Sequence, residues 1–257
     1  MPNSSYLCSC DQPVLYPSSQ AGGFDPRTGV IATDAQAVPL LWLAMFRPDD
    51  LVTEVFTFEE DADDGDDADE DDVIEATAPL APKSRALARL DAALPALARL
   101  FPAEIPLDAH AALLREAVER APGAYVTIEL DEIAGLWEGE EEGSFVPALT
   151  GALAAFETAG GAAGAAVPVG GDAPAAAGFA AGDEADPAAL DAARAHLLAL
   201  TRLRPAHPFP PARLLLDTPE ATGDDHWNLV RLLGSTFGRE VPWEGGDVTP
   251  VAAESAP

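Results

Sequence analysis

The sequence is poor in basic side chains, and lysine is nearly absent. Of 257 residues, 14 are Lys or Arg, with Lys83 the one lysine among them, against 44 Asp and Glu, so the formal net charge is −30. The isoelectric point is about 4.1. A protein with this charge repels polyanions, because the field around it is negative. The composition therefore excludes nucleic acid and anionic membrane surfaces as expected partners and favours a basic protein.

Cysteine and long apolar runs are also scarce. The chain has two cysteines, too few for a disulfide framework. No stretch reaches the roughly 18 apolar residues that a membrane span needs, and the N-terminus lacks the basic and apolar segments of a signal peptide. We therefore expect a soluble, cytoplasmic protein. The excess of arginine over lysine and the abundance of alanine indicate a GC-rich bacterial genome or a salt-adapted host.

The sequence also lacks the motifs of common nucleophile and cofactor sites. It contains no Gly-x-Ser-x-Gly, no P-loop and no Gly-x-Gly-x-x-Gly, the patterns that place a serine nucleophile or cradle phosphates. Gly160-Gly161 and Gly170-Gly171 lie in Ala/Gly-rich sequence, where a linker is the simpler interpretation. We therefore expect no cofactor.

The two cysteines, Cys8 and Cys10, are two residues apart on an expected strand and would point to the same face. A zinc site usually has about four ligands, often with a second pair downstream. The histidines of the chain are scattered and have no ligand-spaced partner: His110, His196, His207 and His226. We expect the cysteines to be buried as small apolar residues and expect no metal, with a metal or redox role as the alternative.

A dense acidic segment follows the expected strand over 51–58. Residues 59–75 contain twelve acidic residues and no basic one. An EF-hand loop needs Asp or Asn at its first, third and fifth places and Gly at its sixth, but Gly65 falls in the fifth place counted from Asp61. A mobile, solvated loop is therefore the preferred interpretation, with weak attraction of divalent cations as a secondary property.

Hydrophobic periodicity predicts both strands and helices. Alternation and β-propensity predict strands over 6–10, 30–32, 51–58 and 124–130, the last of them central in the sheet. Helices are predicted over 40–46 and 84–101, from an N-cap at Asp108 to Pro122, over 131–137 and 145–156, from an N-cap at Asp186 onward, and from an N-cap at Asp225 to an end at Gly234. In the 84–101 helix the expected buried face is Leu87, Leu90, Leu94, Leu97 and Phe101, and Pro95 should bend or split it. These elements predict an α+β fold, a small, mainly antiparallel sheet with packed helices.

Composition divides the chain into four parts. Residues 1–158 form the expected α+β core domain, with the acidic loop over 59–75 inside it. Residues 159–185 are an Ala/Gly-rich linker or long loop. Residues 186–243 form a C-terminal helical segment that we expect to pack on the core, because it would be marginally stable alone. Residues 244–257 are expected to be a disordered tail.

Three segments carry a resemblance to a known family: SSYLCSCD at the N-terminus, VPLLWLAMF some thirty residues on, and AYVTIELDEI after two helices. They resemble an uncharacterised bacterial family, a domain of unknown function, whose members begin with a Met-Ala-Asn-Arg-Ser-Tyr-Leu-Tyr-like segment. The likeness covers about residues 1–158. Its matching positions are Asn3, Ser5, Tyr6, Leu7, Pro39, Leu40, Tyr125, Glu129 and Glu132, while Ser4 and Cys8 replace Arg and Tyr. The resemblance implies a fold and assigns no site.

Two classes of function remain open. The first is a non-enzymatic, acidic protein–protein interaction module, immunity-like or inhibitor-like, that binds a basic partner. The alternative is a hydrolase-like enzyme built from dispersed carboxylates and histidines. Its candidate catalytic residues are Glu129, Asp131 and Glu132, at the end of the expected central strand, and His226, at a helix start. An exposed strand end with helix-start acids explains the first three without catalysis, and capping and packing explain the region of His226.

Overall fold

Five strands in the described part of the chain form one sheet, in the order β2-β1-β5-β4-β3, with every neighbouring pair antiparallel. The computed structural model describes residues 3–15, 29–58, 72–101, 105, 107–138, 145–160, 186–211 and 226–235. The strands are β1 (Ser4–Cys10), β2 (Gly29–Ala35), β3 (Leu51–Phe58), β4 (Asp72–Pro82) and β5 (Tyr125–Glu129). As predicted from its alternating pattern, the segment within 124–130 is the central strand.

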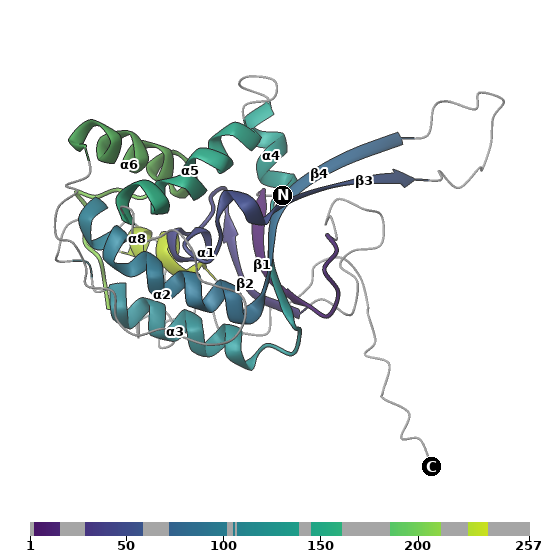
Figure 1. The fold of residues 1–257 in the computed structure, drawn as a ribbon, viewed down its shortest axis with the longest axis horizontal. Helices are drawn as coiled ribbons and strands as arrows, with labels where there is room; N and C mark the ends of the chain where they lie inside the picture. The colour runs from purple at the N-terminus through teal and green to yellow at the C-terminus, as the bar shows by residue number, and fades with distance from the viewer. Residues whose placement is uncertain are drawn as a thin grey trace, which may run out of the picture.

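The larger helices lie together on one side of this sheet (Figure 1). They are α2 (Lys83–Leu100), α3 (Leu107–Arg120), α5 (Phe145–Gly160) and α6 (Pro187–Thr201); the shorter ones are α1 (Leu40–Leu43), the 3-10 turn η1 (Pro48–Asp50), α4 (Asp131–Glu138) and α8 (Trp227–Leu233). This arrangement confirms the expected α+β fold with an antiparallel sheet. Among the helices in the described ranges, none is both long enough and apolar enough to cross a lipid bilayer.

The strand register divides the side chains of the sheet between two faces. Leu7 lies opposite Ile128, and both are fully buried in the core beneath the helices. Cys8 lies opposite Thr127, one residue along each strand. Because successive side chains of a strand point to opposite sides, Cys8 and Thr127 lie on the other side of the sheet. We call these two sides the helix face and the far face.

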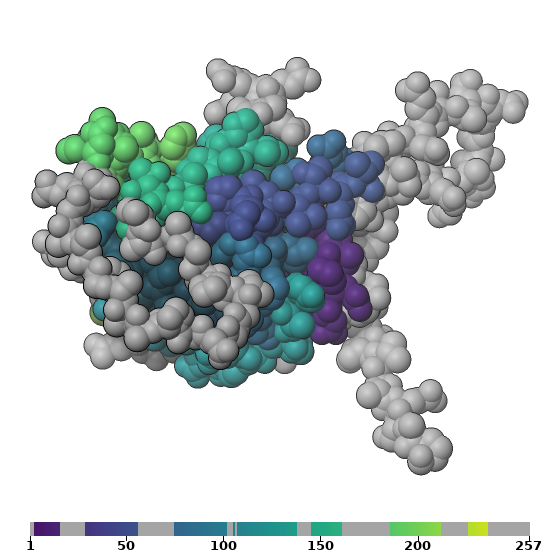
Figure 2. Space-filling model, in the orientation of Figure 1, coloured from purple at the N-terminus to yellow at the C-terminus, as the bar shows by residue number. Residues whose placement is uncertain are grey.

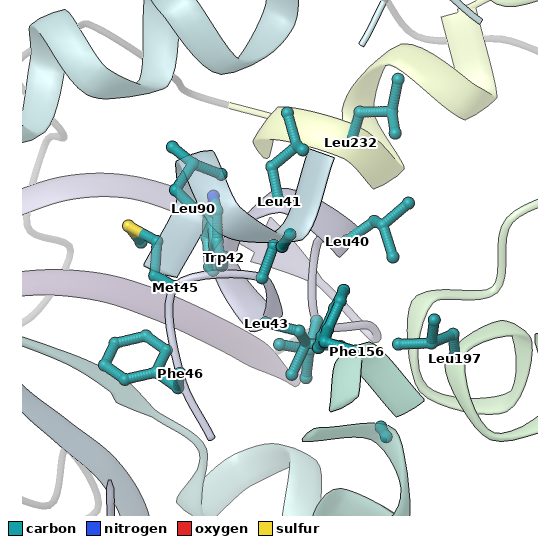
Figure 3. Close-up of a cluster of buried hydrophobic side chains, with 14 of the residues drawn as sticks. Leu40, Leu41, Trp42, Leu43, Met45, Phe46, Leu90, Phe156, Leu197 and Leu232 are labelled. Carbon is teal, nitrogen blue, oxygen red and sulfur yellow. The ribbon is translucent and has the colours of Figure 1, made fainter. Parts of the chain in front are cut away.

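The apolar run Leu40–Phe46 forms the centre of the core, and each of its side chains is fully buried. Figure 3 shows side chains from α2, α5, α6 and α8 converging on it: Leu90, Phe156, Leu197 and Leu232. The predicted helix over 40–46 is shorter in the structure, since α1 ends at Leu43. Met45 and Phe46 continue in tight turns, with amides bonded to carbonyls three residues back at 3.1 and 3.0 Å. An α-helix needs bonds four residues back.

The buried face of α2 differs from the predicted leucine stripe. Leu90 and Leu97 are fully buried, whereas Leu87 and Leu94 are only partly buried. The remaining buried positions are mostly alanines: Ala86, Ala93, Ala96 and Leu100. Alanine is often fully buried in proteins, but a pattern weighted by large side chains does not detect it. Pro95 does not split the helix, which runs through it as one element.

Two expected boundaries in the first half of the chain are corrected. β4 begins at Asp72, so 72–75 belong to a strand and not to the acidic loop expected over 59–75. The rest of that segment, 59–71, lies outside the described residues. α3 begins at Leu107, which places Asp108 in its first turn, where a carboxylate also favours the helix. Asp108 is therefore not the N-cap of α3.

Boundaries in the second half shift in a similar way. α5 extends to Gly160, beyond the expected start of the linker. The N-cap of α8 is His226, while Asp225, the expected cap, lies outside the described residues. The expected linker from 161 onward and the expected tail over 244–257 also lie outside them.

The helices α6 and α8 pack against earlier parts of the chain. α6 lies against α5 and buries Leu197 completely. Its N-cap is Asp186, as predicted, whose carboxylate accepts a hydrogen bond from the amide of Ala188 at 3.1 Å. α8 packs against α1, where the indole Nε1 of Trp42 donates to the carbonyl of Leu233 at 3.0 Å. These contacts join the C-terminal helices to the same core.

Candidate functional site

Glu129, the last residue of β5, lies on the far face opposite Tyr6 of β1. Only 5% of its surface is exposed. Its Oε1 accepts a hydrogen bond from the amide of Asp131 at 2.9 Å. The sequence favours an exposed strand end at Glu129, and this burial corrects that interpretation, because the far face is not open to solvent at this point.

Asp131 and Glu132 lie in the first turn of α4, as expected for acids at a helix start. The Oε2 of Glu132 accepts a hydrogen bond from the amide of Ser4 at 2.7 Å, and its carbonyl accepts one from Nδ2 of Asn3 at 3.0 Å. These two bonds fasten the beginning of β1 to α4. The carboxylate of Glu132 therefore has a structural role.

His226 lies on the opposite side of the sheet from Glu129. It is the N-cap of α8, and its side chain makes no capping hydrogen bond. Arg231 of the same helix bonds to Asp34 of β2. Asp34 is opposite Ser5, which shares the helix face with residue 7, so α8 packs on the helix face. The structure therefore does not bring His226 and Glu129 together into one site.

The two cysteines lie on the far face, and Cys8 lies close to Glu129, a proximity of which the sequence gives no sign. Cys8 has no exposed surface and Cys10 has 1%, and both are free thiols. Burial raises the pKa of Cys8 well above its ordinary value, and the charge of Glu129 raises it further. Burial and the neighbouring Asp11 raise the pKa of Cys10 to about 11. Both thiols are thus protonated at neutral pH, which makes them weak nucleophiles and weak metal ligands.

Thr127 contributes a further polar group to this part of the far face. It is opposite Cys8 and 5% exposed, and its buried Oγ1 has no hydrogen-bond partner among the residues that the structure describes. We call Tyr6, Cys8, Thr127 and Glu129 the far-face cluster. Burial also raises the pKa of Tyr6. In the described ranges of the chain no three His, Cys, Asp or Glu side chains come together in a way that could hold a metal ion.

A buried ion pair, which sequence analysis did not detect, joins α8 to β2. Nη1 of Arg231 lies 2.5 Å from Oδ2 of Asp34 and donates to the carbonyl of Ala35 at 2.7 Å. The side chains of the pair are 8% and 1% exposed. Burial raises the pKa of Asp34 to about 7, although Arg231 acts in the opposite direction.

Two residues at the start of α8 hold the segment that follows α6. The ring of Trp227 has the guanidinium carbons of Arg204 and Arg231 at 3.8 and 4.5 Å from its centroid. Asn228 is fully buried. Its Oδ1 accepts the amide of Arg204 at 2.9 Å, and its Nδ2 donates to the carbonyls of residues 204, 207 and 208 at 2.8, 3.1 and 3.2 Å. These contacts hold the segment after α6 against the start of α8, so the region has a structural role.

The third candidate region is the β3–β4 ribbon, residues 51–58 paired with 72–79. β4 pairs with β5 only through Leu80–Pro82, so the ribbon extends beyond the rest of the sheet (Figure 1). Figure 2 shows it at the surface, on the side of the molecule away from α6. Val55 on β3 is 60% exposed. Residues 51–82 include thirteen acidic residues and no Lys or Arg.

Arginines of α2 hold the root of the ribbon. Nη2 of Arg85 and Nη2 of Arg89 lie 2.6 and 2.7 Å from the two carboxylate oxygens of Asp49 in η1. Arg89 also pairs with Asp50, which is 3% exposed. The Oδ2 of Asp50 accepts the amide of Arg47 at 2.9 Å. The ribbon therefore leaves the body of the protein from a fixed point.

Comparison of the chain with models of protein families, with curated proteins and with solved structures finds no match. The function is therefore argued from the geometry and charge of these regions.

Proposed function

We propose that this protein is a non-enzymatic, acidic interaction module, immunity-like or inhibitor-like, which binds a basic protein partner through the β3–β4 ribbon. The observation that carries the proposal is the ribbon itself, which extends past the sheet on a fixed root, within a stretch of sequence, 51–82, that has thirteen acids and no base. Acidic surfaces of this kind attract basic proteins and accelerate their association at low salt.

The placing of the basic residues supports the same proposal. Arg85 and Arg89 pair with acids at the root of the ribbon, and Arg231 pairs with a buried acid of β2. Arginines held in this way neutralise acids within the fold, so these described arginines do not compensate the charge along the ribbon. A partner with surface Lys and Arg would supply that compensation.

We further propose that the protein acts in the bacterial cytoplasm and belongs with the uncharacterised family that its first 158 residues resemble. The resemblance of SSYLCSCD and AYVTIELDEI to that family supports the second part. The composition, with its excess of arginine over lysine and its scarcity of cysteine, supports the first.

The experiment compares two matched pairs of charge-neutralising substitutions. A partner is first captured from host extract at low salt, purified and shown to be basic. Its association rate is then measured with wild type, with Asp72→Asn/Glu75→Gln on the ribbon, and with Glu116→Gln/Glu119→Gln on the exposed surface of α3. We expect the ribbon pair to slow association by about threefold or more at low salt, and the α3 pair to change it much less.

Two results would contradict the proposal. One is capture of partners that are not basic, or whose binding does not weaken with salt. The other is an equal effect of the two pairs of substitutions, because that would assign the attraction to the net charge of the molecule and not to the ribbon.

The alternative function, a hydrolase-like enzyme, is favoured by one observation. Glu129 is 5% exposed and lies beside Thr127, whose buried Oγ1 finds no hydrogen-bond partner in the described part of the chain. Against it, the structure separates His226 from Glu129, and Glu129 bonds to a backbone amide at the start of α4. Turnover of ester, amide or phosphate substrates that Glu129→Gln abolishes without loss of stability would favour the enzyme over the interaction module.

A further inference from the structure

Among the described residues, one edge of the β3 strand has no strand beside it. It is the last strand of the sheet, and in the part of the chain that the structure describes it pairs with β4 alone. Such an edge presents backbone N–H and C=O groups that another extended chain can bond. Proteins commonly protect an edge of this kind with charged residues or proline.

The register identifies the backbone groups on this edge. Leu51 lies opposite Pro79, and proline has no N–H, so this is a non-hydrogen-bonded pair of the ladder. Pair types alternate along an antiparallel ladder. The even-numbered residues of β3 therefore bond to β4, while Thr53, Val55 and Thr57 turn their N–H and C=O groups outward.

The side chains beside this edge differ between the two surfaces of the ribbon. Thr53 and Val55 are exposed on one surface, where Oγ1 of Thr53 lies 2.8 Å from Oγ1 of Thr77 across the ribbon. Glu54 is on the other surface, and its carboxylate accepts the amide of Leu15 at 3.1 Å. An added strand would thus meet an apolar and hydroxyl surface on one side and a carboxylate on the other.

Charge determines which occupant fits this edge. Two copies of the chain pairing along β3 would bring two negatively charged parts of the sequence toward each other, since residues 51–82 of each contain thirteen acids and no base. Like charges that come within the Debye length of roughly 10 Å repel each other. The same acids attract a segment rich in Lys and Arg, so the charge opposes a second copy and favours a basic strand.

We propose that the basic partner binds by strand addition: an extended segment of it pairs antiparallel with Thr53–Thr57 as a sixth strand. This inference rests on the proposed function and specifies how the ribbon performs it. Antiparallel addition continues the pattern of the whole sheet. In that geometry the partner residue opposite Val55 forms a hydrogen-bonded pair with it and has an apolar side chain. The residues before and after it in the partner are Lys or Arg, and their side chains lie on the same surface of the ribbon as Glu54.

The test uses a capped hexapeptide of alternating lysine and valine and two N-methylated forms of it. One form carries N-methyl groups on the valines and the other on the lysines, so both have the same charge, composition and number of methyl groups. The proposal requires the valine N–H groups to face β3. We expect the valine-methylated peptide to bind the full-length protein about tenfold more weakly than the lysine-methylated one.

A substitution in the protein tests the same edge from the other side. Val55→Pro removes an N–H that points away from β4, so the hydrogen bonds to β4 stay in place. Proline is tolerated at such positions on edge strands. Val55→Thr keeps the N–H and serves as its control. We expect Val55→Pro, but not Val55→Thr, to weaken binding of the unmethylated hexapeptide by several-fold. If Val55→Pro fails to fold by circular dichroism, the methylated peptides still decide the question.

Each outcome has a distinct meaning. Equal binding of the two methylated peptides, with both bound at low salt, overturns strand addition and leaves the proposed function standing. No binding of any peptide at low salt, or binding unaffected by Asp72→Asn/Glu75→Gln, overturns the proposed function itself. A wild-type dimer in sedimentation that Val55→Pro dissociates would replace the basic partner with a second copy of the chain.

Discussion

At the scale of single residues, Gly234 occupies a place at the end of α8 that admits no side chain. Its φ is +101°, a conformation that residues with a Cβ rarely adopt. A Cβ at this position would lie 2.6 Å from Cζ2 of Trp42 and 2.7 Å from the carbonyl oxygen of Thr33. Glycine therefore allows the end of α8 to approach both the core and β2.

Gly234→Ala should destabilise the protein by about 2–4 kcal/mol, because it adds backbone strain and a steric clash. Its control is Gly135→Ala in α4, where an added Cβ meets nothing within 4 Å. That substitution should be neutral or stabilising by up to about 1 kcal/mol, since alanine is the better helix former. Denaturant unfolding at equilibrium measures both, and similar effects at the two glycines would refute the argument.

Thr127 and Ile128 are adjacent residues of β5, and we expect substitutions at the two positions to change the stability of the protein in opposite directions. The buried hydroxyl of Thr127 has no hydrogen-bond partner within the described ranges, so Thr127→Val should raise the free energy of unfolding by about 1 kcal/mol. Ile128 is fully buried on the helix face, so Ile128→Ala should lower it by about 2–5 kcal/mol. Thermal and denaturant unfolding test both changes. A loss of stability in Thr127→Val would mean that the hydroxyl has a partner, such as a bound ligand.

At the scale of elements, the buried pair of Arg231 and Asp34 links α8 to the sheet and should make stability depend on pH. The folded-state pKa of Asp34 is raised to about 7 from an ordinary 3.8, so folding takes up a proton between these values. The stability that protonated Asp34 contributes is fully present below about pH 3.8 and is lost as pH rises through about 7.

The measurement is the free energy of unfolding between pH 5 and 8 for wild type and for Asp34→Asn, which has no carboxyl group to titrate. Relative to Asp34→Asn, wild type should lose stability as the pH rises through this window. Parallel curves for the two proteins would show that Asp34 stays charged in the folded state, held by Arg231.

The elements that sequence reasoning predicted best are those with strong local patterns. The strands over 4–10 and 125–129 and the caps at Asp186 and Gly234 follow from alternation and from residue chemistry. The predicted buried face of α2 was correct at Leu90 and Leu97 and only partly correct at Leu87 and Leu94, which pack against the core but are partly buried, while alanines take several of the fully buried positions. The predicted end of α1 was wrong, because a run that is apolar on every side has no periodicity from which the length of the helix can be read.

The candidate sites were less predictable, because they depend on contacts between distant parts of the chain. The Asp34–Arg231 pair joins residues 197 positions apart, and no local pattern signals it. The burial of Glu129 was missed because a strand with alternating polar residues normally has one wet face. The acidity of the ribbon, in contrast, is a local property and was visible in the sequence, although its extension beyond the sheet was not.

At the scale of the whole molecule, three arginines pack or pair in the interior of the described structure, while the acids outnumber the bases overall. Arg47 packs over the ring of Phe156 at 5.3 Å from its centroid, and burial lowers its pKa to about 10. Arg89 and Arg231 pair with acids that are almost fully buried. The surface is thus left with most of the net charge of −30. Such self-repulsion opposes compact folding and is weakened by salt.

This charge balance leads to a prediction for the segment 59–71, in which ten of the thirteen residues are acidic. In a variant of equal length with those ten residues changed to Asn or Gln, the net charge changes from −30 to −20. It should be more stable than wild type at about 0.01 M salt, because less repulsion remains, and equal to it at about 1 M salt, where the Debye length falls to roughly 3 Å. Denaturant unfolding at both salt concentrations measures the difference. A loss of stability that persists at high salt would show that these carboxylates make specific contacts within the fold, which would in turn remove them from the charge available to a basic partner.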